Sequence, residues 1–265
     1  MSADALPLKT VQATRYVTPL REGGSLPAVV EADDDGLYVL KFRGAGQGPK
    51  ALVAELVAGE LARALGLPMP ELVFIELDSE FARTEPDPEI QDLIRASEGL
   101  NLGIDYLPGA LNYDPAAMPI DAELASRIVW FDAFVSNVDR TARNPNLMVW
   151  HRKLWLIDHG AALYFHHDWG SAGAACERPF VLIRDHVLLP FATRIGEVDA
   201  AMAAALTDAL IDRIVAAIPG SWLQDEAAFA DGPAHRRAYV DYLKRRRDAR
   251  AAFVQEAIDA HAAHV

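Results

Sequence analysis

Short stretches in which hydrophobic and polar residues alternate are frequent in the first 110 positions of the chain. Three of them cover residues 11–17, 26–32 and 37–42, and an Asp-Gly turn joins the last two. Alternation with a period of two is typical of strands, and Asp-Gly is a common turn of β-hairpins. Similar stretches follow at residues 71–77 and 99–109. We therefore expect an antiparallel sheet here, beginning with a three-stranded meander.

Hydrophobic residues at helical spacing predict the other elements. One helix is expected over residues 49–65, with a proline at its start and a glycine after its end. A second covers residues 121–137, with an aspartate as its N-cap. The tail is Ala-rich and predicts two long amphipathic helices, over about residues 197–218 and 235–261, with Trp222 packed between them.

A β-hairpin is predicted between the second helix and the tail. Two short apolar stretches, at residues 147–150 and 154–157, enclose a polar turn. If the hairpin folds about residue 152, Asn146 falls opposite Asp158. The ends of the two strands then lie side by side.

Acidic and amide side chains gather at this end of the hairpin. Asp139 precedes Asn144 by five positions, across a loop that contains Pro145, and Asn146 and Asp158 lie at the strand ends. Oxygen ligands of this kind suit Mg²⁺ better than zinc, and a carboxylate that binds no metal can accept a proton from an attacking hydroxyl. Phosphoryl transfer needs these parts. The alternative is a polar loop whose Asn and Asp side chains only cap turns.

Two charged residues in the first 110 positions have a structural and a functional interpretation. Lys41 interrupts an apolar strand, either as a solvated charge at a sheet edge or as a phosphate-binding lysine that reaches into a cleft. Glu55 lies beside the apolar stripe of the helix over residues 49–65. It is either an acid favoured by the helix dipole or the ion-pair partner of Lys41.

Composition excludes several classes of protein. The net charge of −13 argues against a general nucleic-acid-binding protein, and the one dense basic run, residues 244–247, is interpreted as the solvated face of a helix. No apolar run is long enough to span a membrane. With one cysteine, Cys176, no intrachain disulfide can form. We expect a soluble protein of a reducing compartment, most simply the cytoplasm.

The motifs together resemble a known group. Asp-x-x-x-x-Asn, followed by a hairpin and Asp-x-Gly, resembles the signature of the protein-kinase-like superfamily. The specific motifs here, Asp-Arg-x-x-x-Asn and Ile-Asp-His-Gly, are most similar to those of HipA-like kinases and their phosphatidylinositol-kinase relatives. HipA-like kinases often have a histidine two residues after the aspartate of this motif, and this chain has Thr141 at that position. The resemblance implies an α+β, bilobal protein-kinase-like fold. Its N-lobe, residues 1–110, has a small antiparallel sheet with one helix, and its C-lobe, residues 111–265, is mainly helical.

The resemblance also implies residue roles and cofactors. Lys41 would hold the α- and β-phosphates of ATP, and Glu55 would orient Lys41. Asp139 would act as the catalytic aspartate that aligns a hydroxyl acceptor. Asn144 and Asp158 would hold Mg²⁺, although the sequence leaves open whether Asn146 shares the metal.

Glycine-rich segments offer two candidates for the phosphate loop. Gly23, Gly24 and Ser25 resemble that loop by their position between two strands. Residues 44–48 are either a mobile flap over the site or a simple connection from strand to helix. Neither segment is a P-loop motif.

Two further residues have alternative roles near the loop that carries Asp139. Arg140 either neutralises phosphate or ties the loop down. Asp132, near the apolar stripe of its helix, either braces the loop by hydrogen bonding or faces water.

Three functional hypotheses follow. The first is a kinase that uses ATP and Mg²⁺ and phosphorylates a protein Ser or Thr or a small molecule. The second is a nucleotide-binding pseudokinase. The third is a metal-dependent hydrolase built on Asp139, Asp158 and the histidines at 159, 166 and 167, which are otherwise interpreted as surface or supporting residues.

Overall fold

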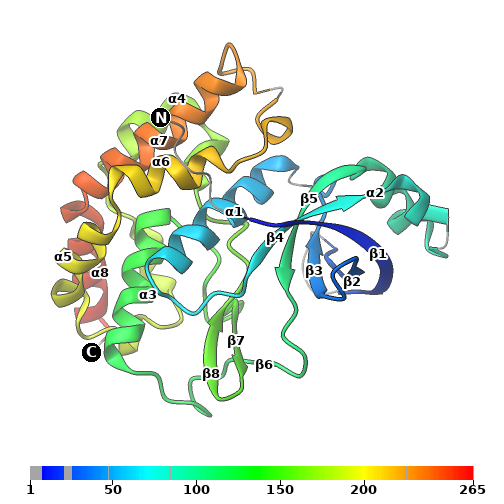
Figure 1. Ribbon diagram of the computed structural model, residues 1–265. Coiled ribbons are helices and arrows are strands. Elements are labelled where there is room, and N and C mark those ends of the chain that lie inside the picture. Colours follow the sequence, from blue (N-terminus) through cyan, green and yellow to red (C-terminus); the bar gives the residue numbers. More distant parts are fainter. Residues whose placement is uncertain (1–7, 21–25, 47, 84, 225, 265) are drawn as a thin grey trace.

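The computed structural model describes residues 8–20, 26–46, 48–83, 85–224 and 226–264. It has a β-barrel on one side and a mainly helical part on the other, with helix α1 between them (Figure 1). The protein is therefore of the α+β class.

The barrel is built from five strands in the order β1-β2-β3-β5-β4. The strands are β1 (Thr10–Pro19), β2 (Ala28–Ala32), β3 (Leu37–Lys41), β4 (Leu72–Leu77) and β5 (Gly99–Asp105). The predicted meander of β1, β2 and β3 is confirmed, since both pairings are antiparallel. The prediction of an antiparallel sheet is wrong at one pairing, because β1 runs parallel to β4. That pairing closes the sheet into a barrel, and closure pairs the strand edges that an open sheet would expose.

A second, three-stranded sheet contains the predicted hairpin. It consists of β6 (Leu111–Asn112), β7 (Leu147–Trp150) and β8 (Lys153–Leu156). The hairpin is confirmed, but its predicted register is wrong by one position, since Trp150 pairs with Lys153. Its turn is His151-Arg152, and both residues have positive φ angles, of 47° and 63°. Ile157, not Asp158, therefore lies opposite Asn146, to whose carbonyl its N–H donates at 3.0 Å.

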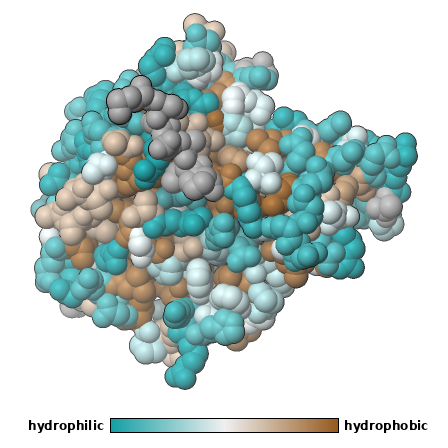
Figure 2. Space-filling model, viewed as in Figure 1, coloured by the Kyte–Doolittle hydropathy of each residue, from teal (hydrophilic) through white to brown (hydrophobic). Residues whose placement is uncertain are grey.

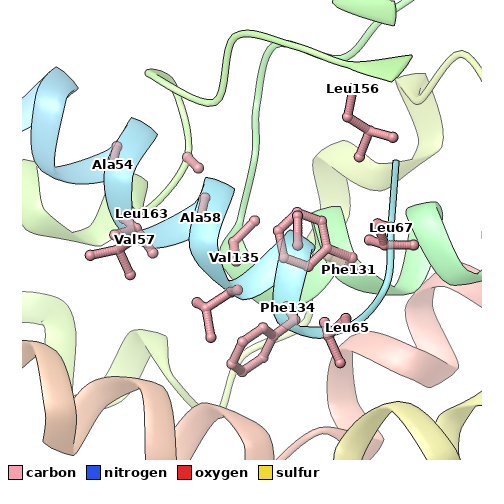
Figure 3. Close-up of a cluster of buried hydrophobic side chains, with 14 of the residues drawn as sticks. Ala54, Val57, Ala58, Leu65, Leu67, Phe131, Phe134, Val135, Leu156 and Leu163 are labelled. Atoms are coloured by element: carbon pink, nitrogen blue, oxygen red, sulfur yellow. The ribbon is translucent and has the colours of Figure 1, made fainter. Parts of the chain in front are cut away.

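Helix α1 (Pro49–Ala64) is the central element of the fold. It follows the predicted bounds, with a proline in its first turn and Gly66 at φ 68° just after its end. Most of its residues are buried, so it is enclosed on nearly all sides and not along one stripe alone. In Figure 3 its Ala58 lies near Phe131 and Val135 of α3 (Ala122–Val135), within one buried cluster.

The helices of the second half are shorter than the pattern predicted. The tail contains α5 (Ile195–Ala205), α6 (Asp208–Ala216), α7 (Gly232–Asp248) and α8 (Ala251–Ala262). Each predicted long helix is thus two helices. The first break falls at Thr207, whose side chain caps α6 by accepting from Leu210 N–H. The remaining helices are α2 (Pro88–Ala96) and α4 (Trp169–Ala175), with short 3₁₀ turns η1 (Ser79–Arg83), η2 (Tyr164–His167), η3 (Val181–Asp185), η4 (Leu189–Phe191) and η5 (Gly220–Trp222).

Two predictions for the tail are wrong. Trp222 packs on the barrel and not between the tail helices: its ring meets Phe74 of β4 at 5.8 Å, and its Nε1–H donates to the carbonyl of Leu100 in β5. Within the basic run, Arg246 is 1% exposed and donates to the carbonyl of Ala133 at 3.0 Å. The run is therefore not simply a solvated face.

Few large hydrophobic side chains are exposed among the described residues. On the face drawn in Figure 2 hydrophilic residues cover most of the area, and hydrophobic residues form scattered patches. Such scattered exposure is ordinary for a folded domain. Within the described ranges, no helix is long and apolar enough to cross a membrane.

Candidate active site

Lys41, the last residue of β3, lies where the barrel, α1 and the segment after β8 meet. Its Nζ is 2.8 Å from Oε2 of Glu55 on α1 and 2.5 Å from Oδ1 of Asp158. The side chains of Lys41 and Glu55 are 10% and 0% exposed, whereas that of Asp158 is 45% exposed. The structure thus joins three of the predicted site residues at the edge of solvent.

Burial and pairing act in opposite directions on these charges. Burial alone would lower the pKa of Lys41, but the attraction of Glu55 and Asp158 outweighs it and leaves that pKa above its ordinary value. Burial would raise the pKa of Glu55, yet Lys41 and the contact with His159 hold it below the ordinary value. Both members of the pair therefore carry their charge at neutral pH.

Asp158 has an unusual backbone. Its φ is 53°, in the left-handed region, and it follows directly after the residue that pairs with Asn146. A non-glycine residue in this region costs about 1 kcal/mol or more, and such residues cluster at functional sites. The left-handed turn ends the hairpin and places a half-exposed carboxylate next to Lys41.

The loop before the hairpin joins the other predicted site residues. Asn144 Nδ2 donates to Asp139 Oδ2 at 2.7 Å, and Asn146 Nδ2 reaches the same oxygen at 3.4 Å. Thr141 closes the loop, since its N–H lies 3.0 Å from the carbonyl oxygens of both Asp139 and Asn144. Because each amide donates through nitrogen, its own oxygen remains for another partner. Asp139 is held in orientation while its second oxygen, Oδ1, stays available.

Arg140 ties this loop down. It is 1% exposed, its Nε lies 2.6 Å from Asp132 Oδ2, and its Nη1 donates to the carbonyls of Asn146 and Ile157. Of the two roles considered for Arg140, the structure supports loop bracing and leaves it no access to a solvent-side phosphate. Asp132 is likewise a buried brace and does not face water, since it also accepts from Asn137 Nδ2 at 3.0 Å.

His186 completes the brace and was not predicted. Its Nδ1 accepts from the backbone N–H of Leu188 at 3.0 Å, so its proton is on Nε2, which donates to Asp132 Oδ2 at 2.9 Å. Burial lowers the pKa of His186 and outweighs the raising effect of Asp132. The two residues are 54 positions apart, and no local pattern marks His186 as a partner of Asp132.

Asp132 itself stays ionised inside this brace. Burial alone would raise its pKa, but the Coulomb attraction of Arg140 and the hydrogen bond from His186 hold it below its ordinary value. The ion pair between Asp132 and Arg140 is therefore present across the neutral range.

The glycine-rich candidates differ in what the structure says of them. Gly23, Gly24 and Ser25 lie outside the described residues. Of residues 44–48, the described part connects β3 to α1, and Gly44 N–H donates to Ser97 Oγ at 3.0 Å. A Cβ on Gly44 would lie 2.7 Å from the Cβ of Ala96, so this end of the connection packs closely on the last residue of α2.

The histidines after Asp158 do not assemble as a metal site. Within the described part of the chain, no group of three or more His, Cys, Asp or Glu side chains is placed to hold a metal ion. His159 and His166 are fully buried, so of the two interpretations, surface or supporting residues, the structure excludes the first for these two histidines. His166 Nδ1 pairs with the Tyr239 hydroxyl at 3.0 Å, and burial lowers its pKa well below the ordinary value.

Oxygen atoms at the solvent edge of the site fit a hard cation. Asp158 offers a half-exposed carboxylate and Asn144 an exposed amide whose oxygen is unpaired in this arrangement. Carboxylate and amide oxygens with water in the remaining positions are typical of Mg²⁺ sites. The donor set thus fits magnesium better than a transition metal.

Comparison with known proteins gives a family and a fold. A family model described as HipA-like kinase matches residues 14–250. The crystal structure of a Helicobacter pylori proinflammatory kinase, CtkA, is 12% identical with a TM-score of 0.53, covering 98% of this chain and 100% of that chain. The Golgi casein kinase is 13% identical with a TM-score of 0.45, covering 93% of this chain and 74% of that chain. Curated proteins gave no significant match. The likeness to CtkA indicates a kinase-like fold.

Proposed function

This chain belongs to the HipA-like kinase family, and from that premise we propose that it is an ATP- and Mg²⁺-dependent phosphotransferase acting on a hydroxyl acceptor. The observation that carries the proposal is the Lys41 ammonium, buried against Glu55 and in contact with the half-exposed Asp158. A buried cation held next to a solvent-facing carboxylate is the arrangement that a bound polyphosphate and its cation require.

In the proposed reaction Lys41 binds the α- and β-phosphates, and Glu55 fixes the direction of its ammonium. Asp139 aligns the acceptor hydroxyl and accepts its proton through the carboxylate oxygen that Asn144 and Asn146 leave available. Positioning and charge neutralisation account for most of the catalysis of phosphoryl transfer, so these residues need no covalent intermediate.

Asn144 and Asp158 are the proposed magnesium ligands, with Asn146 as the alternative to Asn144. When bound, Mg²⁺ would neutralise charge on the phosphates. The exposure of Asn144 supports this choice, because Asn146 is buried.

The finer organisation of the protein is part of the same proposal. We place an N-lobe at residues 1–110 and a C-lobe at residues 111–265, with Gly23, Gly24 and Ser25 as the phosphate loop. The acceptor is a protein Ser or Thr or a small molecule. The single cysteine, Cys176, is buried and free, which fits a reducing compartment such as the cytoplasm.

The proposal is tested by the unfolding midpoint with ATP, with and without Mg²⁺. A ligand at 100 times its Kd adds about 2.7 kcal/mol of stability, so wild type should show a clear Mg²⁺-dependent shift. Asp158→Asn should lose it, because an amide is a weaker ligand for Mg²⁺ than a carboxylate. Asp241→Asn, an exposed residue of α7, is the matched control and should keep it. Absence of any shift in wild type at millimolar Mg·ATP would contradict the proposal.

A further inference from the structure

His159, the middle residue of the Asp-His-Gly segment, lies buried between α1 and the loop that carries Asp139. Its backbone N–H donates to Glu55 Oε2 at 2.9 Å, and its ring faces Phe131 edge-on with centroids 5.9 Å apart. The ring has one nitrogen toward Arg140 and the other toward Glu55. His159 thus contacts both the group around Lys41, through Glu55, and the loop that carries Asp139, through Arg140.

The contact with Arg140 fixes the tautomer of this ring. His159 Nε2 is 2.9 Å from Arg140 Nη2. A guanidinium has N–H donors and no acceptor, so Nε2 must offer its lone pair. In the neutral ring the proton is then on Nδ1.

The protonated nitrogen faces an acceptor that lacks a partner. Nδ1 is 3.7 Å from Glu55 Oε1, and neither atom has a hydrogen-bond partner although both are buried. A buried donor and a buried acceptor are each costly when unpaired, and here they are complementary.

We propose that His159, as its Nδ1–H tautomer, is a positioning residue for phosphoryl transfer that joins Glu55 on α1 to Arg140 of the catalytic loop. It touches no reacting group itself. Through Glu55 it sets the place of Lys41, and through Arg140 it sets the loop that carries Asp139. The positioning role rests on the proposed function, whereas the tautomer rests on the geometry alone.

Three substitutions test the contacts of the two ring nitrogens separately. His159→Asn keeps an amide near Nδ1, His159→Gln keeps one near Nε2, and His159→Phe keeps a ring of similar size and removes both contacts. His151→Asn, at an exposed position of the β7–β8 turn, is the matched control.

The kinetic test compares kcat and KM for ATP at a temperature where each variant is folded. We expect His159→Phe to lower kcat on the order of tenfold to a hundredfold with a smaller change in KM, because misplacement acts mainly in the transition state. His159→Asn and His159→Gln should each recover part of the loss, and His151→Asn should match wild type. A wild-type kcat in folded His159→Phe, with only its unfolding midpoint lowered, would make the role purely structural and overturn the proposal.

The ring nitrogens give a readout that does not depend on activity. Long-range ¹H–¹⁵N spectra of histidine-labelled protein, with the His159 signal assigned by its loss in His159→Gln, should show a protonated Nδ1 and a bare Nε2. A bare Nδ1 and a protonated Nε2 would contradict the proposal that His159 joins Glu55 to Arg140. If wild type neither binds Mg·ATP nor transfers phosphate, the positioning role falls with the proposed function, while the spectrum still decides the tautomer.

Discussion

Two ion pairs in this protein share their burial and differ in their surroundings. Lys41 pairs with Glu55, and Arg140 pairs with Asp132, at 2.8 Å and 2.6 Å. Lys41 has a further partner in Asp158, whose side chain is 45% exposed. The other pair is closed off, since both of its side chains are 0% exposed. One pair opens toward solvent and the other is sealed.

The difference indicates two uses of the same interaction. A buried ion pair stabilises a fold no better than well-packed hydrophobic residues do, so its presence calls for another reason. The sealed pair orders the Asp139 loop, because Arg140 also donates to the carbonyls of Asn146 and Ile157. The open pair instead presents a fixed cation beside an accessible carboxylate. We infer that the first is architectural and the second serves the ligand.

Breaking the sealed pair should give the largest effect on stability. Asp132→Ala leaves the Arg140 charge buried without its carboxylate, which costs about 3–5 kcal/mol of unfolding free energy. Denaturant unfolding measures this loss, with Asp241→Ala as the exposed control. A loss below about 1 kcal/mol, as for a surface pair, would contradict the distinction between the two pairs.

The sealed pair should also make the free energy of unfolding depend on pH, through its contact with His186. Burial keeps the pKa of His186 below its ordinary value, so the folded protein holds this ring neutral while the unfolded chain takes up a proton below about pH 6.5. Stability from this residue is therefore present at higher pH and lost as pH falls from about 7 to 5.5, by up to about 1 kcal/mol.

His186→Gln tests that dependence, because it keeps a donor toward Asp132 and removes the titration. The difference between the unfolding free energies at about pH 7 and about pH 5.5 should be smaller than in wild type, by up to about 1 kcal/mol. His151→Gln, at an exposed histidine, should leave the difference as it is. An unchanged difference in His186→Gln would show that His186 does not titrate as described.

Replacing Asp158, the exposed further partner of Lys41 in the open pair, should give the smallest effect on stability and a large effect on ligand binding. In Asp158→Asn the side chain is half exposed and asparagine tolerates the left-handed backbone, so the unfolding free energy should change by less than about 1 kcal/mol. Mg²⁺-dependent affinity for ATP, measured by calorimetry, should be lost. A stability loss as large as that of Asp132→Ala would remove the contrast between the pairs.

The parts of this account that follow local patterns could be predicted from the sequence. The hairpin, the Asp121 N-cap and the bounds of α1 all depend on residues within one or two turns of one another, and all are confirmed. The hairpin register was missed because its turn, His151-Arg152, takes positive φ angles without the glycine or asparagine that usually signals them.

The parts that depend on distant residues could not be predicted. The parallel pairing of β1 with β4 joins segments that are separated by the whole meander and α1. The contact of His186 with Asp132 and the burial of His159 against Glu55 arise only when α1, α3 and the later loops pack together. The break at Thr207 is different, since its capping signal was present in the sequence and was overlooked.

The most direct test of the central claim is a single-turnover reaction with γ-labelled ATP and Mg²⁺, comparing wild type with Asp139→Asn. Label transferred to any hydroxyl is counted, on added acceptors, on the protein itself or on water. We predict transfer by wild type and a loss of at least about 100-fold in Asp139→Asn, because the amide cannot accept the proton. Binding of Mg·ATP without transfer by wild type to any of these acceptors would contradict the phosphotransferase and leave a nucleotide-binding protein.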